Sequence, residues 1–108
     1  MPFTSSAAVA LALGGTFALS ISAVAETPER GRQLLQQNCG SCHAIGATDR
    51  SAHPAAPPFK WIGRRYDVDA LTERMRDILV STHADMPSFR FSRTDARAIR
   101  TYLNSIQQ

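Results

Sequence analysis

The feature that most constrains this chain is the pentapeptide Cys-Gly-Ser-Cys-His at residues 39–43, which contains the only two cysteines among 108 residues. A zinc site would need four ligands, and besides carboxylates only His53 and His83 lie outside the pentapeptide to complete it. A thioredoxin-like dithiol would need a βαβ setting, and the chain has no strand pattern. A disulfide between Cys39 and Cys42 would close a loop too short to add much stability. Each of these alternatives leaves part of the pentapeptide unexplained.

The same pentapeptide is the pattern of covalent c-type haem attachment. Two thiols three positions apart can add to the two vinyl groups on one edge of a porphyrin, so Cys39 and Cys42 are predicted to hold the haem. The next residue, His43, then lies under the ring, where its imidazole can bind the iron from the proximal side. The pentapeptide therefore predicts haem c as the cofactor and His43 as an iron ligand.

The charge is unevenly distributed, because residues 1–25 contain no Asp, Glu, Lys or Arg and every charged residue falls within residues 26–108. Those later residues form one domain, and they contain only 14 Ile, Leu, Val and Met. A domain with so few aliphatic side chains usually needs a disulfide, a metal, a cofactor or a partner to complete its core. A two-domain enzyme and a nucleotide-binding parallel sheet are excluded. The net charge of +3, without a Lys/Arg run, also argues against a nucleic-acid partner.

Residues 1–25 are predicted to be an export signal, because an apolar, Ala-rich stretch ends in Ala23-Val24-Ala25, the small-x-small pattern of a cleavage site. The alternative is an uncleaved membrane anchor, since residues 7–25 are just long enough to span a bilayer. No twin-Arg pair precedes the stretch, so the chain would cross the membrane unfolded. The predicted location is the periplasm, where haem-attachment machinery would add the cofactor to residues 26–108.

The polar and apolar pattern predicts three helices and no strands, so the chain is expected to be all-α. Thr27 is placed to cap a helix from Pro28 to Asn38. Asp67 is placed to cap a second helix that runs to about Val80, and Ser92 a third helix that runs to Ile106. The second helix is predicted to bury one face, formed by Val68, Leu71, Met75, Ile78 and Leu79. Residues 44–66 and 81–91 are predicted to be loops, and so long a first loop indicates a functional role.

With these elements in order, residues 28–108 resemble the class I monohaem cytochromes c of bacteria. The resemblance implies a cytochrome c fold, in which three main helices and long loops wrap around one haem and the first and last helices cross. Gly31, eight residues before Cys39, matches the small residue of that crossing. The family also implies a distal axial methionine, and Met86 before Pro87 is the candidate.

Two other residues compete with Met86 for the sixth coordination position. His83 could give bis-histidine ligation, whereas Met75 lies within the apolar face of a helix and is better explained as a core residue. If neither Met86 nor His83 binds, the iron is open.

The resemblance further implies that a proline carbonyl in the first loop accepts the second N–H of His43. Pro57 and Pro58 are the candidates, with Pro54 a weaker third. The aromatic residues that follow are expected to pack on the haem, and either Trp61 or Tyr66 is expected to reach a propionate. His53 is expected to be a surface histidine.

The predicted function is therefore electron transfer by a haem with His43 and Met86 as axial ligands, not enzymatic catalysis. Its partners would be redox proteins whose identities the sequence does not reveal. One alternative is a haem subunit permanently docked to a respiratory dehydrogenase or oxidase. Another is a haem sensor or enzyme with an open distal site, and the role of Met86 discriminates between it and the carrier.

Overall fold

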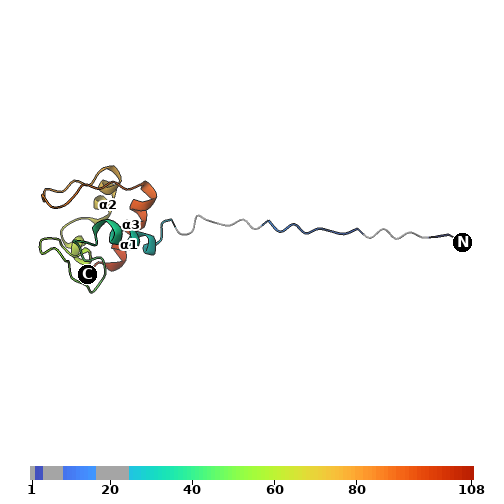
Figure 1. Cartoon of the computed structure of the whole chain (residues 1–108), viewed down its shortest axis with the longest axis horizontal. Coiled ribbons are helices and arrows are strands. Elements are labelled where there is room, and N and C mark those ends of the chain that lie inside the picture. Colours follow the sequence, from blue (N-terminus) through green and yellow to red (C-terminus); the bar gives the residue numbers. More distant parts are fainter. Residues whose placement is uncertain (1, 4–8, 17–24) are drawn as a thin grey trace.

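The computed structural model describes residues 2–3, 9–16 and 25–108, so most of the predicted export signal lies outside the described residues. Residues 25–108 contain three α-helices and one 3₁₀ helix (Figure 1): α1 (Pro28–Cys39), η2 (Phe59–Arg64), α2 (Val68–Asp77) and α3 (Arg93–Ile106). The predicted all-α fold is confirmed. In the described ranges, no helix is both long and apolar enough to cross a bilayer.

Each α-helix begins at the residue that the sequence predicts as its cap. The side-chain oxygens of these caps accept backbone N–H groups of the first turn, at 3.2 Å for Thr27 and Arg30, 2.8 Å for Asp67 and Ala70, and 3.1 Å for Ser92 and Asp95. Such bonds satisfy N–H groups that have no partner within the helix, which is why short polar residues determine where a helix starts.

The crossing of α1 and α3 is confirmed at Gly31. A Cβ on this residue would overlap the carbonyl oxygen of Ala98, 2.5 Å from its carbonyl carbon and 2.9 Å from the Ile99 nitrogen. Only glycine lets the two backbones approach this closely. The salt bridge between Arg30 and Asp95, at 3.5 Å, lies beside this crossing and also joins the two helices.

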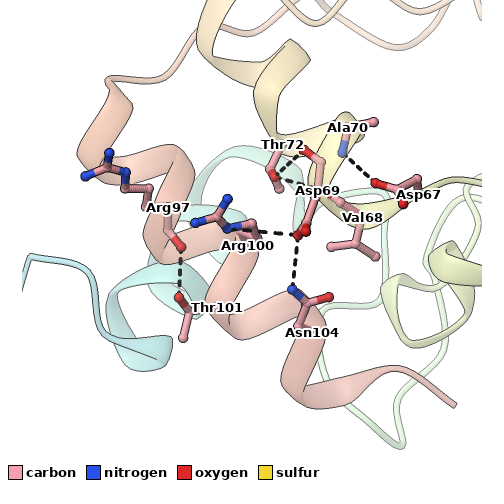
Figure 2. A network of polar contacts seen from close by, with 9 residues as sticks. All are labelled: Asp67, Val68, Asp69, Ala70, Thr72, Arg97, Arg100, Thr101 and Asn104. Atoms are coloured by element: carbon pink, nitrogen blue, oxygen red, sulfur yellow. Dashed lines mark hydrogen bonds and ion pairs between the residues drawn. The ribbon is translucent and has the colours of Figure 1, made fainter.

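Helix α2 packs on α3 through a polar network at its N-terminal end (Figure 2). The Asp69 carboxylate accepts a hydrogen bond from Asn104 at 3.3 Å and lies 4.0 Å from the Arg100 guanidinium. The Thr72 hydroxyl lies 3.0 Å from the carbonyl oxygens of both Val68 and Asp69, so this buried polar group is satisfied within its own helix. These contacts orient α2 against the α1–α3 pair.

Two predictions about α2 are wrong. The helix ends at Asp77 and not near Val80, and the side chain of Ile78 is 55% exposed, not buried. Long-range backbone pairing explains the early end, because Leu79 and Phe89 form an antiparallel β-bridge with N–O distances of 2.7 and 3.1 Å. The Phe91 N–H also donates to the Met75 carbonyl at 2.9 Å. The chain that follows Met86 is therefore tied to the end of α2 by the bridge and by this additional hydrogen bond.

The predicted loop at residues 44–66 is not wholly irregular, because it contains η2. A 3₁₀ turn has three residues per turn and leaves no amphipathic period that a sequence pattern could reveal over six residues. Phe59 and Ile62, three positions apart, are buried in the core. The centre of that core is formed by Leu35, Ile99 and Leu103, whose side chains are fully buried between α1 and α3.

Candidate functional site

The end of α1 brings the pentapeptide to a cavity. Cys39 is the last residue of α1, and the chain then turns so that the N–H groups of Cys42 and His43 both donate to the Cys39 carbonyl, at 3.2 and 2.9 Å. This tight turn keeps the two cysteines and the histidine on one side of the chain end, and all three line the same cavity. The two cysteines do not form a disulfide with each other.

The two thiols differ in their surroundings. Cys39 is buried, whereas Cys42 is half-buried. Burial raises the pKa of the Cys39 thiol to about 11, and the neighbouring Cys42 sulfur adds to the rise. In the folded chain the Cys39 thiol is therefore protonated at neutral pH, which makes it a poor nucleophile.

The His43 ring is held in place by two contacts. Its Nδ1 atom lies 2.8 Å from the Pro57 carbonyl oxygen, so Nδ1 carries the proton and donates. The Phe59 ring stacks on the imidazole, with 4.7 Å between ring centroids and 19° between planes. In this tautomer the lone pair of Nε2 is free to bind a metal. Of the tandem prolines, Pro57 thus makes the contact, while Pro58 precedes the first residue of η2.

The cavity encloses about 650 Å³ of empty space, including the part open to solvent. Three segments line it: the end of α1, the loop before η2 and the loop between α2 and α3. The residues of its wall are Asn38, Cys39, Ser41, Cys42, His43, His53, Ala55, Ala56, Pro57, His83, Asp85, Met86, Pro87 and Phe89.

Met86 lines the same cavity as His43, although the two are far apart in the sequence. Its side chain is partly buried and packs against the core. His83 also lines the cavity but is exposed, and its carbonyl accepts the Met86 N–H at 3.2 Å. Met75 is 3% exposed within the core and does not line the cavity, as expected for a packing residue.

His53 is more than a surface histidine. It lines the cavity, and its Nε2 lies 3.6 Å from the Asp85 carboxylate in the Met86 loop. The Ala55 N–H donates to its Nδ1 at 3.1 Å, so Nε2 is the protonated nitrogen. Phe89 and Asp85 were not expected in the wall, and no local pattern marks them, because their position follows from the β-bridge beyond α2.

Trp61 and Tyr66 are not brought into the cavity wall. Their side chains are 41% and 48% exposed, and the centroid of the Trp61 ring lies 5.0 Å from the Lys60 ammonium and 5.2 Å from the Arg64 guanidinium. The spacing of η2 explains this, because residues three apart share a face and Phe59 and Ile62 occupy the buried one.

This set of donors fits a haem c. Two thiols for thioether bonds, an imidazole with a fixed tautomer and a methionine thioether all line one cavity. The described part of the chain holds no cluster of three or more His, Cys, Asp or Glu side chains that could bind a bare metal ion.

Comparison with known proteins gives two matches. The family model for "Cytochrome C oxidase, cbb3-type, subunit III" matches residues 26–103. The protein "Cytochrome c-552" of Bradyrhizobium diazoefficiens is 34% identical over 88 residues, which cover 82% of this chain and 83% of that protein. No solved structure gives a significant match.

Proposed function

Because this chain belongs to the c-type cytochrome family of cbb3-type oxidase subunit III, and so holds covalently bound haem c, we propose that it is a periplasmic carrier of single electrons. Cys39 and Cys42 would hold the haem, and His43 and Met86 would occupy the two axial positions. When bound, the haem supplies the ferric/ferrous couple that the family uses in electron transport.

The residues of the chain would keep the site rigid during transfer. The Pro57 carbonyl and the Phe59 ring orient His43, so the imidazole need not move when the charge of the site changes. Met86 would exclude water and exogenous ligands from the distal side. Its neutral thioether disfavours the extra charge of the ferric state and so raises the potential.

The observation that carries this proposal is that Met86 and His43 line one cavity. A carrier needs both axial positions filled, whereas a sensor or an enzyme needs one of them open. The test is the visible spectrum of the purified protein in both redox states, together with carbon monoxide binding by the ferrous form. We expect a methionine-to-iron charge-transfer band in the ferric form and slow, weak carbon monoxide binding. Rapid carbon monoxide binding without that band would favour the sensor or enzyme.

A second candidate function is a haem subunit permanently docked to a respiratory oxidase. The observation that favours it is the description of the matching family, which names an oxidase subunit. Osmotic release of the periplasm followed by gel filtration separates the two. A carrier is expected to elute at the size of residues 26–108, whereas a docked subunit would remain with a larger membrane-bound complex.

We also propose that residues 1–25 are removed on export. The mass of the protein purified from the periplasm tests this directly. It should equal that of residues 26–108 plus one haem, with Glu26 at the N-terminus. A haem-loaded protein that retains residues 1–25 in the membrane fraction would instead identify this segment as an anchor.

A further inference from the structure

A surface formed by η2 and the two residues after it combines aromatic and cationic side chains, all of them exposed except the half-buried Lys60. We call it the η2 platform, and its residues are Lys60, Trp61, Arg64, Arg65 and Tyr66. The two aromatic side chains are among the few large apolar ones that lie exposed in residues 25–108. Trp, Tyr and Arg are the residue types enriched at the centres of protein interfaces. Cation–π contacts of Lys60 and Arg64 with the Trp61 ring also hold these three side chains together.

The platform rests on a braced support. Beneath it Phe59 and Ile62 are buried, and the Gln107 side chain both donates to the Phe59 carbonyl at 2.9 Å and accepts the Gly63 N–H at 2.7 Å. The C-terminal end lies beside η2 (Figure 1), where the Gln108 N–H donates to the Lys60 carbonyl at 2.9 Å. A surface ordered in advance loses little entropy on binding, which favours a docking role.

Among the described residues, no Asp or Glu side chain pairs with a cation of the platform, and the Arg64 Nε–H donates to the backbone oxygen of Gln108 at 3.2 Å. None of the six ion pairs among the described residues involves Lys60, Arg64 or Arg65, and no Asp or Glu occurs between Asp49 and Asp67. The arginines of the α2–α3 face differ, since three of them pair with carboxylates: Arg76 with Glu73 and Asp77, Arg97 with Glu26, and Arg100 with Asp69. The platform is thus a local excess of positive charge that no Asp or Glu side chain of the described residues balances.

The platform is also continuous with the segment that holds His43. Trp61 follows Phe59 by two residues, and Phe59 stacks on the His43 ring at 4.7 Å. Pro57, whose carbonyl accepts the His43 N–H, lies two residues before the first residue of η2. A protein docked on the platform would therefore lie against the segment that contacts the proximal imidazole.

We propose that the η2 platform is the docking surface for an acidic face of a redox partner protein. Trp61 is the central anchor of the contact, and the surrounding cations steer the partner by charge complementarity. The inference rests on the proposed carrier function. In the docked pair, the electron that one centre loses is the electron that the other gains, and no bond is formed or broken.

The experiment measures reduction of the ferric holoprotein by a purified acidic flavodoxin in its fully reduced form. The flavin loses one electron and the haem iron gains it. Lys60→Glu/Arg65→Glu tests the charge, and Trp61→Ala with Trp61→Phe tests the anchor. Arg74→Glu/Arg93→Glu is the matched control, because it makes the same change in net charge at two exposed residues that have no ion pair. If the first double variant does not fold, Lys60→Gln/Arg65→Gln replaces it, with Arg74→Gln/Arg93→Gln as its control.

At low ionic strength we expect the platform double variant to lower the second-order rate constant about tenfold or more, since electrostatic steering contributes factors of roughly 10 to 1,000. Trp61→Ala should lower it about tenfold, with Trp61→Phe in between, and the control should change it less than about twofold. Equal losses in platform and control variants, or no loss in either, would overturn the inference.

Failure of the docking surface can be distinguished from failure of the carrier function. The absorption spectrum, the midpoint potential and carbon monoxide binding of each variant report on the haem site and do not depend on docking. If these are normal while platform and control variants react alike, only the docking inference is lost. If the unmutated protein has an open iron, the carrier proposal itself fails.

Discussion

At the scale of single residues, the cavity depends on side chains that reach it from separate segments. His43 is fixed by contacts of its own neighbourhood, with Pro57 at 2.8 Å and Phe59 stacked on its ring. Met86 has no such local support and owes its place to the loop between α2 and α3. The distal side should therefore be the part of the site that a single substitution alters most easily.

Met86→Ala is the substitution that tests the distal side. Loss of the thioether should let carbon monoxide bind the ferrous protein readily, remove the methionine-to-iron band and lower the midpoint potential, because water or hydroxide replaces the thioether. The covalent haem should remain, since Cys39, Cys42 and His43 are untouched. Stopped-flow mixing with carbon monoxide measures the effect.

His83→Ala is the matched control, because His83 lines the same cavity but is exposed. It should leave the band and the slow carbon monoxide binding as they are. If His83→Ala opens the iron while Met86→Ala does not, the axial ligand is the histidine.

Gly31 presents a second residue-scale constraint. Gly31→Ala should destabilise the haem-bound protein, because even one methyl group would overlap the Ala98 carbonyl group. Overpacking of a close contact typically costs about 1–3 kcal/mol. Thermal unfolding of the holoprotein measures the loss, and Gln37→Ala, at an exposed position of α1, is the control. An unchanged melting temperature for Gly31→Ala would contradict the close crossing.

At the scale of elements, α3 connects the whole fold. It crosses α1 at Gly31, packs on α2 through Asp69, and reaches the loop after the pentapeptide through Tyr102, whose hydroxyl donates to the Ile45 carbonyl at 2.7 Å. Both Ile45 and Tyr102 are buried. This bond holds the loop that leads to Pro57 against the helix pair.

Tyr102→Phe should therefore lower the stability of the holoprotein, because the buried Ile45 carbonyl would lose its partner. An unsatisfied buried polar group costs about 1–3 kcal/mol. Urea unfolding of the holoprotein measures the difference. Tyr66→Phe, at an exposed tyrosine, is the control and should have little effect.

The same tyrosine predicts a dependence on alkaline pH. Burial raises the pKa of Tyr102 above its usual value of 10.0, and the nearby Arg32 guanidinium opposes part of that rise. The folded state holds the Tyr102 hydroxyl proton more tightly than the unfolded state does. The protonated hydroxyl therefore makes its full contribution to the free energy of unfolding below pH 10, and this contribution is lost as the pH rises through the folded-state pKa. As the pH rises above 10, the free energy of unfolding should therefore fall less for Tyr102→Phe than for the unmutated protein. Equal falls would contradict the assignment of this pH dependence to Tyr102.

At the scale of the whole molecule, the cofactor completes the core. Residues 26–108 contain only 14 Ile, Leu, Val and Met, and several core side chains, among them Cys39 and Phe59, lie at or beside the cavity. Attachment and folding should thus be coupled.

The double variant Cys39→Ala/Cys42→Ala tests this coupling. Without covalent haem the mature chain should be largely unfolded, because its aliphatic side chains cannot form a core around an absent cofactor. Amide dispersion in NMR spectra is the measurement. Ser41→Ala, within the same pentapeptide, should attach haem and fold normally. A well-dispersed spectrum from the haem-free double variant would show that the protein core suffices.

Much of this molecule could be predicted from local sequence. The pentapeptide and the three helix caps act through residues a few positions away in the sequence. The glycine at the helix crossing acts through the absence of a side chain. Thr27, Asp67 and Ser92 all cap where the pattern places them, because a cap bonds within its own first turn. Family resemblance added the order of the elements and the candidate Met86.

Other features were decided only by tertiary structure. Pairing of Leu79 with Phe89 ends α2 at Asp77 and exposes Ile78, although the helical pattern continues to Val80. Phe59 and Ile62 form the buried face of η2, so Trp61 faces outward. Only the folded loop selects Pro57 over Pro58 as the partner of His43. In each case a contact between distant segments satisfies backbone or core groups that local preference leaves undetermined.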